Sequence, residues 1–524
     1  MPLRILFSIR NPSYVRHYES VLRLLAGRGH EVALVTEPTE KQSWPGSVLR
    51  LVEDVPRIQL SLMPALASDP WFELATRLRQ ARFYLRFLDP KYGGMPALGE
   101  RARSRAPALT VRLAESAGLG GRGRRLIARV IDVLERATCT SRAFYPYLRE
   151  MRPDVVVATP LVVLKTTQLD LMRAAIELGI RNVFAVASWD NLSSKGELTF
   201  APQQLVVWNA LQQQEAAELH EVDPARVVVT GAQVFDEWFD KRPSTSREAF
   251  CARVGLRPDR PLVLYVCSAL LEGSPPEPRF VEQWVRHLRS STHPVLRDCN
   301  ILIRPHFKRG DEWKDVTVTT LDGVVCWPPL GAVPADRTSK TDYFDSMHHA
   351  DAVVGLNTSA MIEAAIVGRP VYTVLLPQFR DSQEGTVHFH YLLEGPDALL
   401  HAARSFDQHA EGLSAQLEHR AADPERSARF VRMFVRPGPM DCPATVRFAD
   451  AIEALAGRPA PSPEPAPVWA AALRPWLAPF ARAAARRVRR IRDEHRRNKE
   501  AQLEAHRTRK AQAKRPAAER PRSA

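Results

Sequence analysis

Cysteine is scarce in this chain and long apolar runs are missing. Both facts limit the classes of protein to which the chain can belong. The six cysteines among 524 residues include no Cys-x-x-Cys pair and no close histidine at metal-ligand spacing. This argues against a disulfide framework or a zinc module and favours reduced thiols in a cytosolic setting. No stretch of about 18 uncharged apolar residues occurs, and arginine interrupts the opening MPLRILFSIR. We therefore expect neither a membrane span nor a signal peptide.

Most of the chain also carries little net charge, although the formal net charge of the whole sequence is +14. Residues 468–524 hold 17 of the 73 Lys and Arg but only 5 of the 59 Asp and Glu. The rest of the chain is therefore nearly neutral. The basic total describes a tail and says little about what the folded body binds.

Alternating strand and helix patterns predict an α/β fold built from two Rossmann-like, doubly wound domains. The expected strands lie at 4–9, 32–36, 154–158, 183–187, 205–208 and 226–230, then at 261–268, 300–304, 323–327, 352–355 and 370–375. A polar stretch at 241–247 separates the two series. We expect a first domain over 1–240 with a helical insertion at about 55–150, a second over 248–457, and a Pro/Ala linker with a basic tail over 458–524.

The sharpest local pattern follows the expected strand at 352–355. Asn357, Thr358 and Ser359 lead from this strand into a helix, and Glu363 lies about one turn further on. Hydroxyl side chains at a helix N-terminus, with free N–H groups and a positive dipole end, suit a diphosphate. A capped core helix is the alternative, and the pattern alone does not decide between the two.

Two other strand ends present polar side chains. Arg304 and His306 follow one strand and can contact phosphate or carry a proton, although an ordinary polar strand end is the alternative. The loop Ser188–Gly196 follows another, and there Asp190 can act as a general base with Asn191 and Lys195 nearby. Turn formation alone explains this loop equally well.

Weaker candidates lie on the first helix and after the expected strand at 370–375. His17 lies near the start of that helix, where it could face the cleft, although a histidine on the helix surface is the commoner alternative. Gln383, His388 and His390 occupy a polar segment, and the two histidines would share a face if it is extended. A donor-site role for this segment is the less favoured interpretation.

Taken in order, these motifs resemble the CDP-glycerol glycerophosphotransferase-like branch of the GT-B superfamily, which is similar to UDP-sugar transferases and epimerases. The resemblance covers about residues 154–376. The family's Trp-His-Gly-x-x-x-Lys loop is matched at 189–195, Gly-x-Pro-Arg-x-Asp partly at 231–236, Arg-x-His at 304–306 and Asp-Tyr-Ser-Ser at 356–359. Asp190 replaces the family's histidine and Asn-Thr replaces Tyr-Ser, so the donor need not be CDP-glycerol.

The resemblance implies a GT-B transferase that needs no metal or other cofactor. Its substrate would be a UDP-, GDP-, CDP- or dTDP-linked sugar, and its acceptor an envelope glycan or a lipid-linked glycan. The implied roles are acceptor base for Asp190, diphosphate binding for Thr358 and Ser359, and leaving-group stabilisation for Arg304 and His306. Asn357 and Lys195 would also bind the donor, and Glu363 would bind donor hydroxyls. A polyol-phosphate transferase, a nucleotide-sugar epimerase and a non-catalytic membrane- or RNA-binding scaffold are the alternatives.

Apolar residues in the basic tail recur at helical spacing: Trp469, Leu473, Trp476, Leu477, Phe480, Ala484, Val488 and Ile491. Such a stripe among arginines favours an anionic membrane surface over nucleic acid. Pro475 and Pro479 favour a broken segment over one long helix. We expect a cytoplasmic protein held by residues 468–524 on the inner face of the membrane, with a disordered tail as the alternative. The aromatic residues of 71–87 form either a second contact or buried core.

Overall fold

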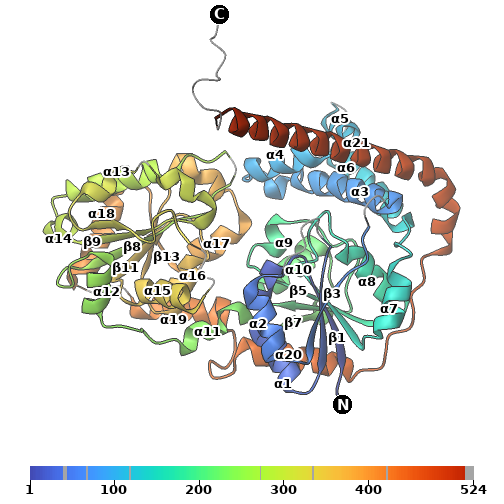
Figure 1. Cartoon of the computed structure of the whole chain (residues 1–524), viewed down its shortest axis with the longest axis horizontal. Coiled ribbons are helices and arrows are strands. Elements are labelled where there is room, and N and C mark those ends of the chain that lie inside the picture. The colour runs from blue at the N-terminus through green and yellow to red at the C-terminus, as the bar shows by residue number, and fades with distance from the viewer. Residues whose placement is uncertain are drawn as a thin grey trace, which may run out of the picture.

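The computed structural model describes residues 1–38, 44–66, 69–116, 120–271, 273–314, 316–332, 336–419 and 423–513. Within these ranges the chain forms two parallel sheets, one of 7 and one of 6 strands, flanked by helices (Figure 1). Their strand orders are β3-β2-β1-β4-β5-β6-β7 and β10-β9-β8-β11-β12-β13. Both sheets grow outward from a central pair of strands, which is the doubly wound Rossmann arrangement. The α/β fold predicted from the sequence is confirmed.

Every strand predicted from the sequence is present. The first sheet contains β1 (Arg4–Ile9), β2 (Glu31–Thr36), β3 (Ile58–Leu62), β4 (Val155–Thr159), β5 (Arg181–Ala185), β6 (Gln204–Val207) and β7 (Val227–Val229). The second contains β8 (Leu262–Val266), β9 (Asn300–Arg304), β10 (Val324–Cys326), β11 (Ala352–Gly355), β12 (Val371–Val374) and β13 (Leu400–Ala403). The sequence patterns miss the edge strands β3 and β13, and β3 falls in the segment expected to be helical.

Helices connect the strands in both units. The first sheet is accompanied by α1 (Glu19–Gly27), α2 (Gly46–Asp54), α7 (Phe144–Met151), α8 (Gln168–Glu177), α9 (Asn191–Ser194), α10 (Ala210–His220) and α11 (Asp236–Asp240). The second is accompanied by α12 (Arg247–Val254), α13 (Glu277–Arg289), α14 (Pro294–Asp298), α15 (Arg337–His348), α16 (Ala360–Ile366), α17 (Val387–Leu393), α18 (Phe406–His419) and α19 (Pro424–Phe430).

The central strands are buried on both faces because helices cover each side of the sheet. Along β4, Val155 and Val157 belong to one apolar core, whereas Val156 and Ala158 belong to another. Successive side chains of a strand point to opposite faces, so a fully apolar strand supplies both cores. This explains why continuous apolar runs identify these strands in the sequence.

The helical insertion is formed by α3 (Pro70–Phe87), α4 (Pro96–Arg105), α5 (Ala108–Glu115) and α6 (Gly121–Ala137). On α3, Phe72, Phe83 and Phe87 are buried. A buried ion pair of 2.9 Å joins Arg79 on α3 to Glu135 on α6. The aromatic residues of 71–87 therefore belong chiefly to buried core, which is the second of the two interpretations that the sequence left open.

The chain returns to the first sheet after completing the second. Helix α20 (Ala444–Ala456) packs against α1, β5 and β6, although we expected residues up to 457 to belong to the second domain. Asp236 fixes this return because its carboxylate accepts bonds from the backbone N–H of Ala444 at 3.2 Å and Thr445 at 2.6 Å, and pairs with Arg436 at 2.5 Å. The partial family match at 231–236 thus ends in a residue with a structural contact.

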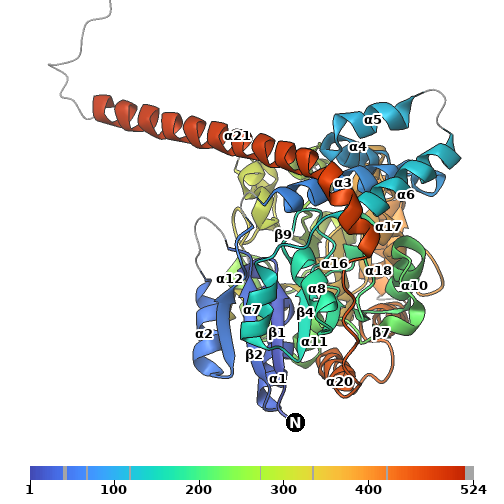
Figure 2. The same ribbon diagram turned by 90° about the vertical axis from the view of Figure 1, so that its right-hand side faces the viewer.

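Residues 468–513 of the tail form one long helix, α21 (Val468–Ala513), which contains Pro475 and Pro479, and residues 514–524 lie outside the described part of the chain. The expectation of a broken segment is therefore wrong. Ala470, Ala481 and Ala484 are buried, and α21 packs along α3 and α6, so tertiary packing offsets the backbone hydrogen bonds that the prolines remove. Figure 2 shows the helix extending past the body of the molecule.

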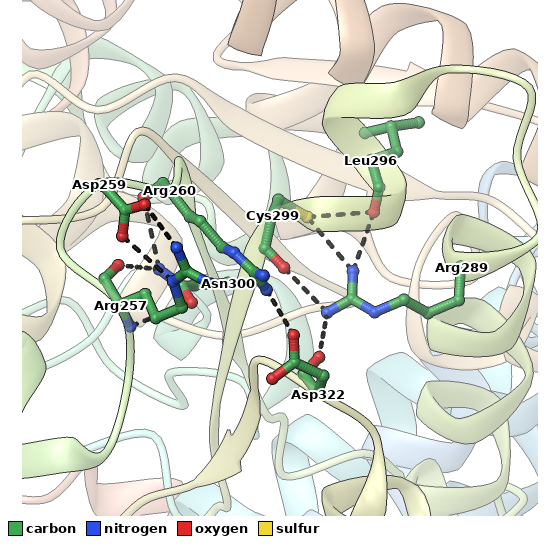
Figure 3. Close-up of polar contacts among 8 residues, drawn as sticks. All are labelled: Arg257, Asp259, Arg260, Arg289, Leu296, Cys299, Asn300 and Asp322. Carbon is green, nitrogen blue, oxygen red and sulfur yellow. Dashed lines mark hydrogen bonds and ion pairs between the residues drawn. The ribbon is translucent and has the colours of Figure 1, made fainter.

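The amino edge of the second sheet is closed by a network of polar contacts (Figure 3). Asn300, the first residue of β9, donates to the carbonyl oxygens of Arg257 at 2.5 Å and Arg260 at 3.3 Å. Arg260 pairs with Asp322 at 2.6 Å, and Arg289 donates to the Asp322 carbonyl oxygen at 3.1 Å. These groups join the loops that precede three strands. The opposite, carboxyl edge is left for ligand binding.

Replacement of Asp236 by alanine should lower the free energy of unfolding by about 3 kcal/mol, because Arg436 and two N–H groups of α20 would lose a buried partner. Urea denaturation of the full chain measures this loss. Asp223→Ala is the matched control, since Asp223 caps an exposed turn through Ala225 N–H at 2.9 Å and should cost about 1 kcal/mol or less. Equal losses in the two variants would contradict the anchoring role of Asp236.

Candidate functional site

A cleft of about 610 Å³ lies between the two units, and a cavity of about 330 Å³ adjoins it. Both are lined by residues from the carboxyl edges of the two sheets. The residues that line both spaces are Ser188, Trp189, Asp190, Lys195, His306, Thr358 and Ser359. Three stretches that the sequence singled out, far apart in the chain, therefore meet in one place.

The Asp190 carboxylate is held by an ion pair and a hydrogen bond. Lys195 Nζ lies 2.6 Å from its Oδ2, and the Ser188 hydroxyl donates to its Oδ1 at 2.8 Å. Burial acts to raise the pKa of Asp190, but Lys195 and His388 more than offset this and hold the pKa well below its ordinary value. The group is therefore a carboxylate at neutral pH.

The loop that carries Asp190 is fixed from several sides. Asn191 Oδ1 accepts the Ala187 N–H at 2.9 Å, which braces the loop on the end of the β5 segment. Arg86, from the insertion, donates to the Leu192 carbonyl oxygen at 3.1 Å. Asn191 is thus brought to the site, where its side chain positions the loop. The insertion holds the same loop in place.

Arg304 reaches the cleft but is already paired. Its guanidinium donates to Asp342 at 3.0 Å and to the Ser346 hydroxyl at 2.6 Å, and it lies over the Tyr343 ring at 5.2 Å. Only 9% of Arg304 is exposed. A phosphate would have to share this guanidinium with Asp342, a partner 38 residues away that the local sequence pattern does not reveal.

His306 lines both spaces and is neutral at pH 7. Burial, with Lys308 and Arg16 adding to it, lowers the pKa of His306 to about 4. Its Nδ1 accepts the Lys308 N–H at 3.3 Å. The proton of the neutral ring therefore belongs on Nε2, which can donate to an anionic ligand.

The loop between β11 and α16 lies at the central strand pair of the second sheet. Asn357 N–H donates to Ser268 Oγ at 3.0 Å, and its side chain donates to the Ser382 carbonyl oxygen at 2.5 Å. Thr358 Oγ1 accepts the Ala360 N–H at 3.4 Å. Ser359 is exposed and precedes α16 without a side-chain capping bond, so its hydroxyl can meet a ligand.

Glu363 and His17 also face the cleft, with shifted pKa values. The Tyr343 hydroxyl donates to Glu363 at 2.6 Å, and burial raises the pKa of Glu363 to about 7. Burial and then the charge of Arg16 lower the pKa of His17 to about 3. This position is compatible with the donor-binding role predicted for Glu363, whereas for His17 the sequence favoured a surface role. Glu363 can exchange a proton near neutrality, whereas His17 stays neutral.

The segment after β12 is helical, so the expectation of a shared histidine face is wrong. His388 and His390 lie two residues apart on α17 and point in different directions. His388 contacts Ser194 Oγ at 3.2 Å and lines the smaller cavity. His390 instead contacts Glu394 at 2.6 Å. The Gln383 amide donates to three groups at the ends of β11 and β12, at 3.1 to 3.2 Å, and braces these strands.

Sequence reasoning missed several basic residues that line the cleft: Arg16, Lys241, Lys308 and Lys340. Arg16 and Lys308 each follow the carboxyl end of a strand, β1 and β9 respectively. That position was the available signal, because ligands of doubly wound sheets bind beyond these ends. Within the described residues, no group of three or more His, Cys, Asp or Glu is arranged to hold a metal ion. Nor does any described helix have the length and apolar character needed to cross a membrane.

Replacement of Lys195 by methionine should lower stability at pH 7 by about 1 to 2 kcal/mol, because Asp190 would lose its counter-charge. The loss should shrink as the pH falls from 7 towards 4. In the wild type the depressed pKa of Asp190 adds stability above the ordinary carboxyl pKa, and this is lost as the pH falls through the folded value. In the variant, burial without the ion pair raises the pKa of Asp190. Protonation at lower pH then removes the cost of the buried, unpaired charge. Thermal melts across this pH range measure the difference.

Lys241→Met is the matched control for this change, since Lys241 lines the same cleft but pairs with the largely exposed Glu237 at 3.2 Å. It should cost less than about 0.5 kcal/mol at every pH. A pH-independent loss of the same size in both variants would show that the Asp190 contact is not the cause.

Comparison with known proteins found no matching protein family and no matching curated protein. Solved structures with a similar course of the chain include a putative UDP-N-acetylglucosamine 2-epimerase from Listeria monocytogenes, with 12% identity, a TM-score of 0.48 and coverage of 87% of this chain and 96% of that chain. A glycosyltransferase from Rickettsia africae ESF-5 has 10% identity, a TM-score of 0.48 and coverage of 87% and 100%. The calicheamicin glycosyltransferase CalG4 has 16% identity, a TM-score of 0.44 and coverage of 88% and 100%.

The strand orders and the shared cleft define the fold independently of these comparisons. Two doubly wound parallel sheets direct their carboxyl edges to one interdomain cleft, which is the GT-B arrangement that the sequence predicts. The CDP-glycerol-like branch stays a prediction from the motifs. The chain has the GT-B fold.

Proposed function

We propose that this chain is a bacterial glycosyltransferase that moves a sugar from a nucleotide-activated donor to an envelope glycan or lipid-linked acceptor. One observation carries the proposal. The ionised Asp190 of the first unit faces the same cavities as His306, Thr358 and Ser359 of the second. A base for the acceptor and hydrogen-bond donors for a diphosphate thus lie on opposite walls of one cleft.

The charge of the cleft favours an anionic donor. The cations that line it are Arg16, Lys195, Lys241, Arg304, Lys308 and Lys340, and the carboxylates are Asp190, Glu237 and Glu363. The excess of cations raises the local concentration of a nucleoside diphosphate. We place the diphosphate near Ser359, His306 Nε2 and Lys195, where charge on the departing nucleotide would be stabilised.

Asp190 is the proposed base. It would take the proton of the acceptor hydroxyl while the new glycosidic bond forms and the bond from the sugar to the diphosphate breaks. The Lys195 ion pair lowers the basicity of Asp190. A donor phosphate against Lys195 would compete for the ammonium group and so raise the pKa of Asp190. The base would then gain strength when a donor is present to react.

Contacts between the units support closure over the substrates. Tyr391 on α17 donates to Glu215 on α10 at 2.6 Å, and His388 on α17 contacts Ser194 on α9 at 3.2 Å. These bonds join the second unit to the first beside Asp190. Their formation would exclude water from the donor and limit its hydrolysis.

Epimerisation of a nucleotide sugar is the second candidate, because Glu363 has a pKa near 7 and faces the cleft. Such a group can exchange a proton with a sugar carbon. Polyol-phosphate transfer and a non-catalytic scaffold remain predictions from the sequence. The proposed cytoplasmic location, on the inner face of the membrane, rests on the apolar stripe and the arginines of the basic tail, residues 468–524.

A thermal-shift screen with UDP, GDP, CDP, ADP and dTDP should show stabilisation by one nucleotide series, since a ligand of the folded state raises the melting temperature. His306→Ala should lower the affinity for that nucleotide by about tenfold, which is the effect of losing one charge-assisted hydrogen bond. His390→Ala is the matched control because His390 lines neither the cleft nor the smaller cavity. The affinity of this variant for the nucleotide should equal that of the wild type. Absence of any shift with the folded protein would contradict the donor site.

Asp190→Asn should abolish transfer of radiolabelled sugar to a bacterial membrane-lipid extract, because an amide cannot take the acceptor proton. Its affinity for the donor should be equal to or above that of the wild type, because the neutral amide keeps the shape of the side chain and no longer competes with donor phosphate for Lys195. Glu237→Gln, a change to another carboxylate of the cleft, is the control and should keep transfer. Proton NMR of the donor incubated without acceptor tests the second candidate, since inversion at a sugar carbon would indicate an epimerase.

A further inference from the structure

Helices α5 and α6 of the insertion carry exposed apolar side chains. On α6, Leu126, Val130 and Val133 follow one another at helical spacing, and Leu126 is 63% exposed. Leu109 and Leu113 form a similar pair on α5, with Leu109 68% exposed. The opposite face of α6 is buried, including Ile131 and Glu135. These exposed residues therefore make a stripe that the core of the insertion does not use.

The first half of α21, which packs against α3 and α6, carries a second apolar stripe. Trp469, Trp476 and Phe480 lie within a narrow sector of the helix, and Trp476 is 78% and Phe480 66% exposed. Helix α21 packs along α3 and α6, and both views show it running beside the insertion (Figures 1 and 2). Ala484 faces the protein instead, so only part of the stripe expected from the sequence is exposed.

The helices that carry the two stripes also carry exposed arginines. On α5 and α6 they are Arg112, Arg122, Arg125, Arg129 and Arg136, and on α21 they include Arg482, Arg486, Arg487, Arg489, Arg490 and Arg492. Narrow apolar stripes with arginines on the same helices differ from the broad apolar centre of a protein interface. They suit the boundary between lipid headgroups and acyl chains, where cations meet anionic lipid.

We propose that the exposed faces of α5 and α6, together with the first half of α21, form one docking surface for an anionic lipid bilayer. The leucines, valines and aromatic rings enter the headgroup region, and the arginines pair with lipid phosphates. The long helix is thus folded on the insertion and presents its residues jointly with it. This assigns membrane contact to α5 and α6, which the basic tail alone does not include.

The insertion also links this surface to the site. Leu98 and Arg101 of α4 line the smaller cavity together with Asp190 and Lys195. Helix α4 leads directly into α5. An acceptor held in the bilayer would therefore reach Asp190 along the insertion. This step rests on the proposed function, whereas lipid binding itself does not.

The full chain is tested by co-sedimentation with vesicles of phosphatidylcholine and phosphatidylglycerol in a three-to-one ratio, against vesicles of phosphatidylcholine alone. The wild type should bind only the anionic vesicles. The double variants Leu126→Glu with Val130→Glu, and Trp476→Glu with Phe480→Glu, should each lower the partition coefficient by about tenfold or more. Leu49→Glu is the matched control, because Leu49 is an exposed leucine on α2, and should bind like the wild type.

Binding of either double variant to the anionic vesicles at the wild-type level would overturn the proposal, as would failure of the wild type to bind. It would also be overturned if the double variants dissociate a dimer in light scattering, which would make the surface an interface between copies, or if binding of poly-U RNA falls in parallel with lipid binding. Each variant is also melted with and without nucleotide. A cooperative melting transition verifies folding, and the shift caused by the nucleotide separates the two proposals. A shift without lipid binding removes the docking surface alone, and lipid binding without a shift removes the donor site alone.

Discussion

The constraint on which the molecule depends is that two parallel sheets direct their carboxyl edges to one cleft. The loops after the β1, β5, β9 and β11 strands all supply side chains to this cleft, so residues far apart in sequence line the same space. The amino edge of the second sheet is closed by its own polar contacts around Asn300. The amino ends of the strands in the second sheet therefore serve stability, and the carboxyl ends of both sheets serve binding. Asp236 holds the returning chain that completes the first unit.

The cleft sets titratable groups in different protonation states. Asp190 is kept ionised by Lys195, His306 is kept neutral by burial and nearby cations, and burial raises the pKa of Glu363 to about 7. Opposed shifts within one site are how a protein divides acid and base work. In the proposed reaction, the same Lys195 connects donor binding to the strength of the base. The docking surface would then bring a membrane-held acceptor to that base along the insertion.

The central strands and most of the candidate site could be predicted because they depend on local sequence. Continuous apolar runs mark strands that are buried on both faces, and polar residues that follow them mark the binding edge. The edge strands β3 and β13 lack such runs, and their residues are partly exposed. Long-range partners could not be read from the sequence. The pairing of Arg304 with Asp342, the return of α20 and the unbroken α21 all arise from tertiary contacts.

The most direct test of the central claim is a crystal structure of the protein with the nucleoside diphosphate that stabilises it. The account predicts the diphosphate between the units, within hydrogen-bond distance of Ser359 and His306, with Lys195 drawn towards phosphate and away from Asp190. A nucleotide bound elsewhere, for example in the cavity of about 650 Å³ lined by Tyr372 and His401 at the edge of the second sheet, with the Asp190–Lys195 pair unchanged, would contradict it.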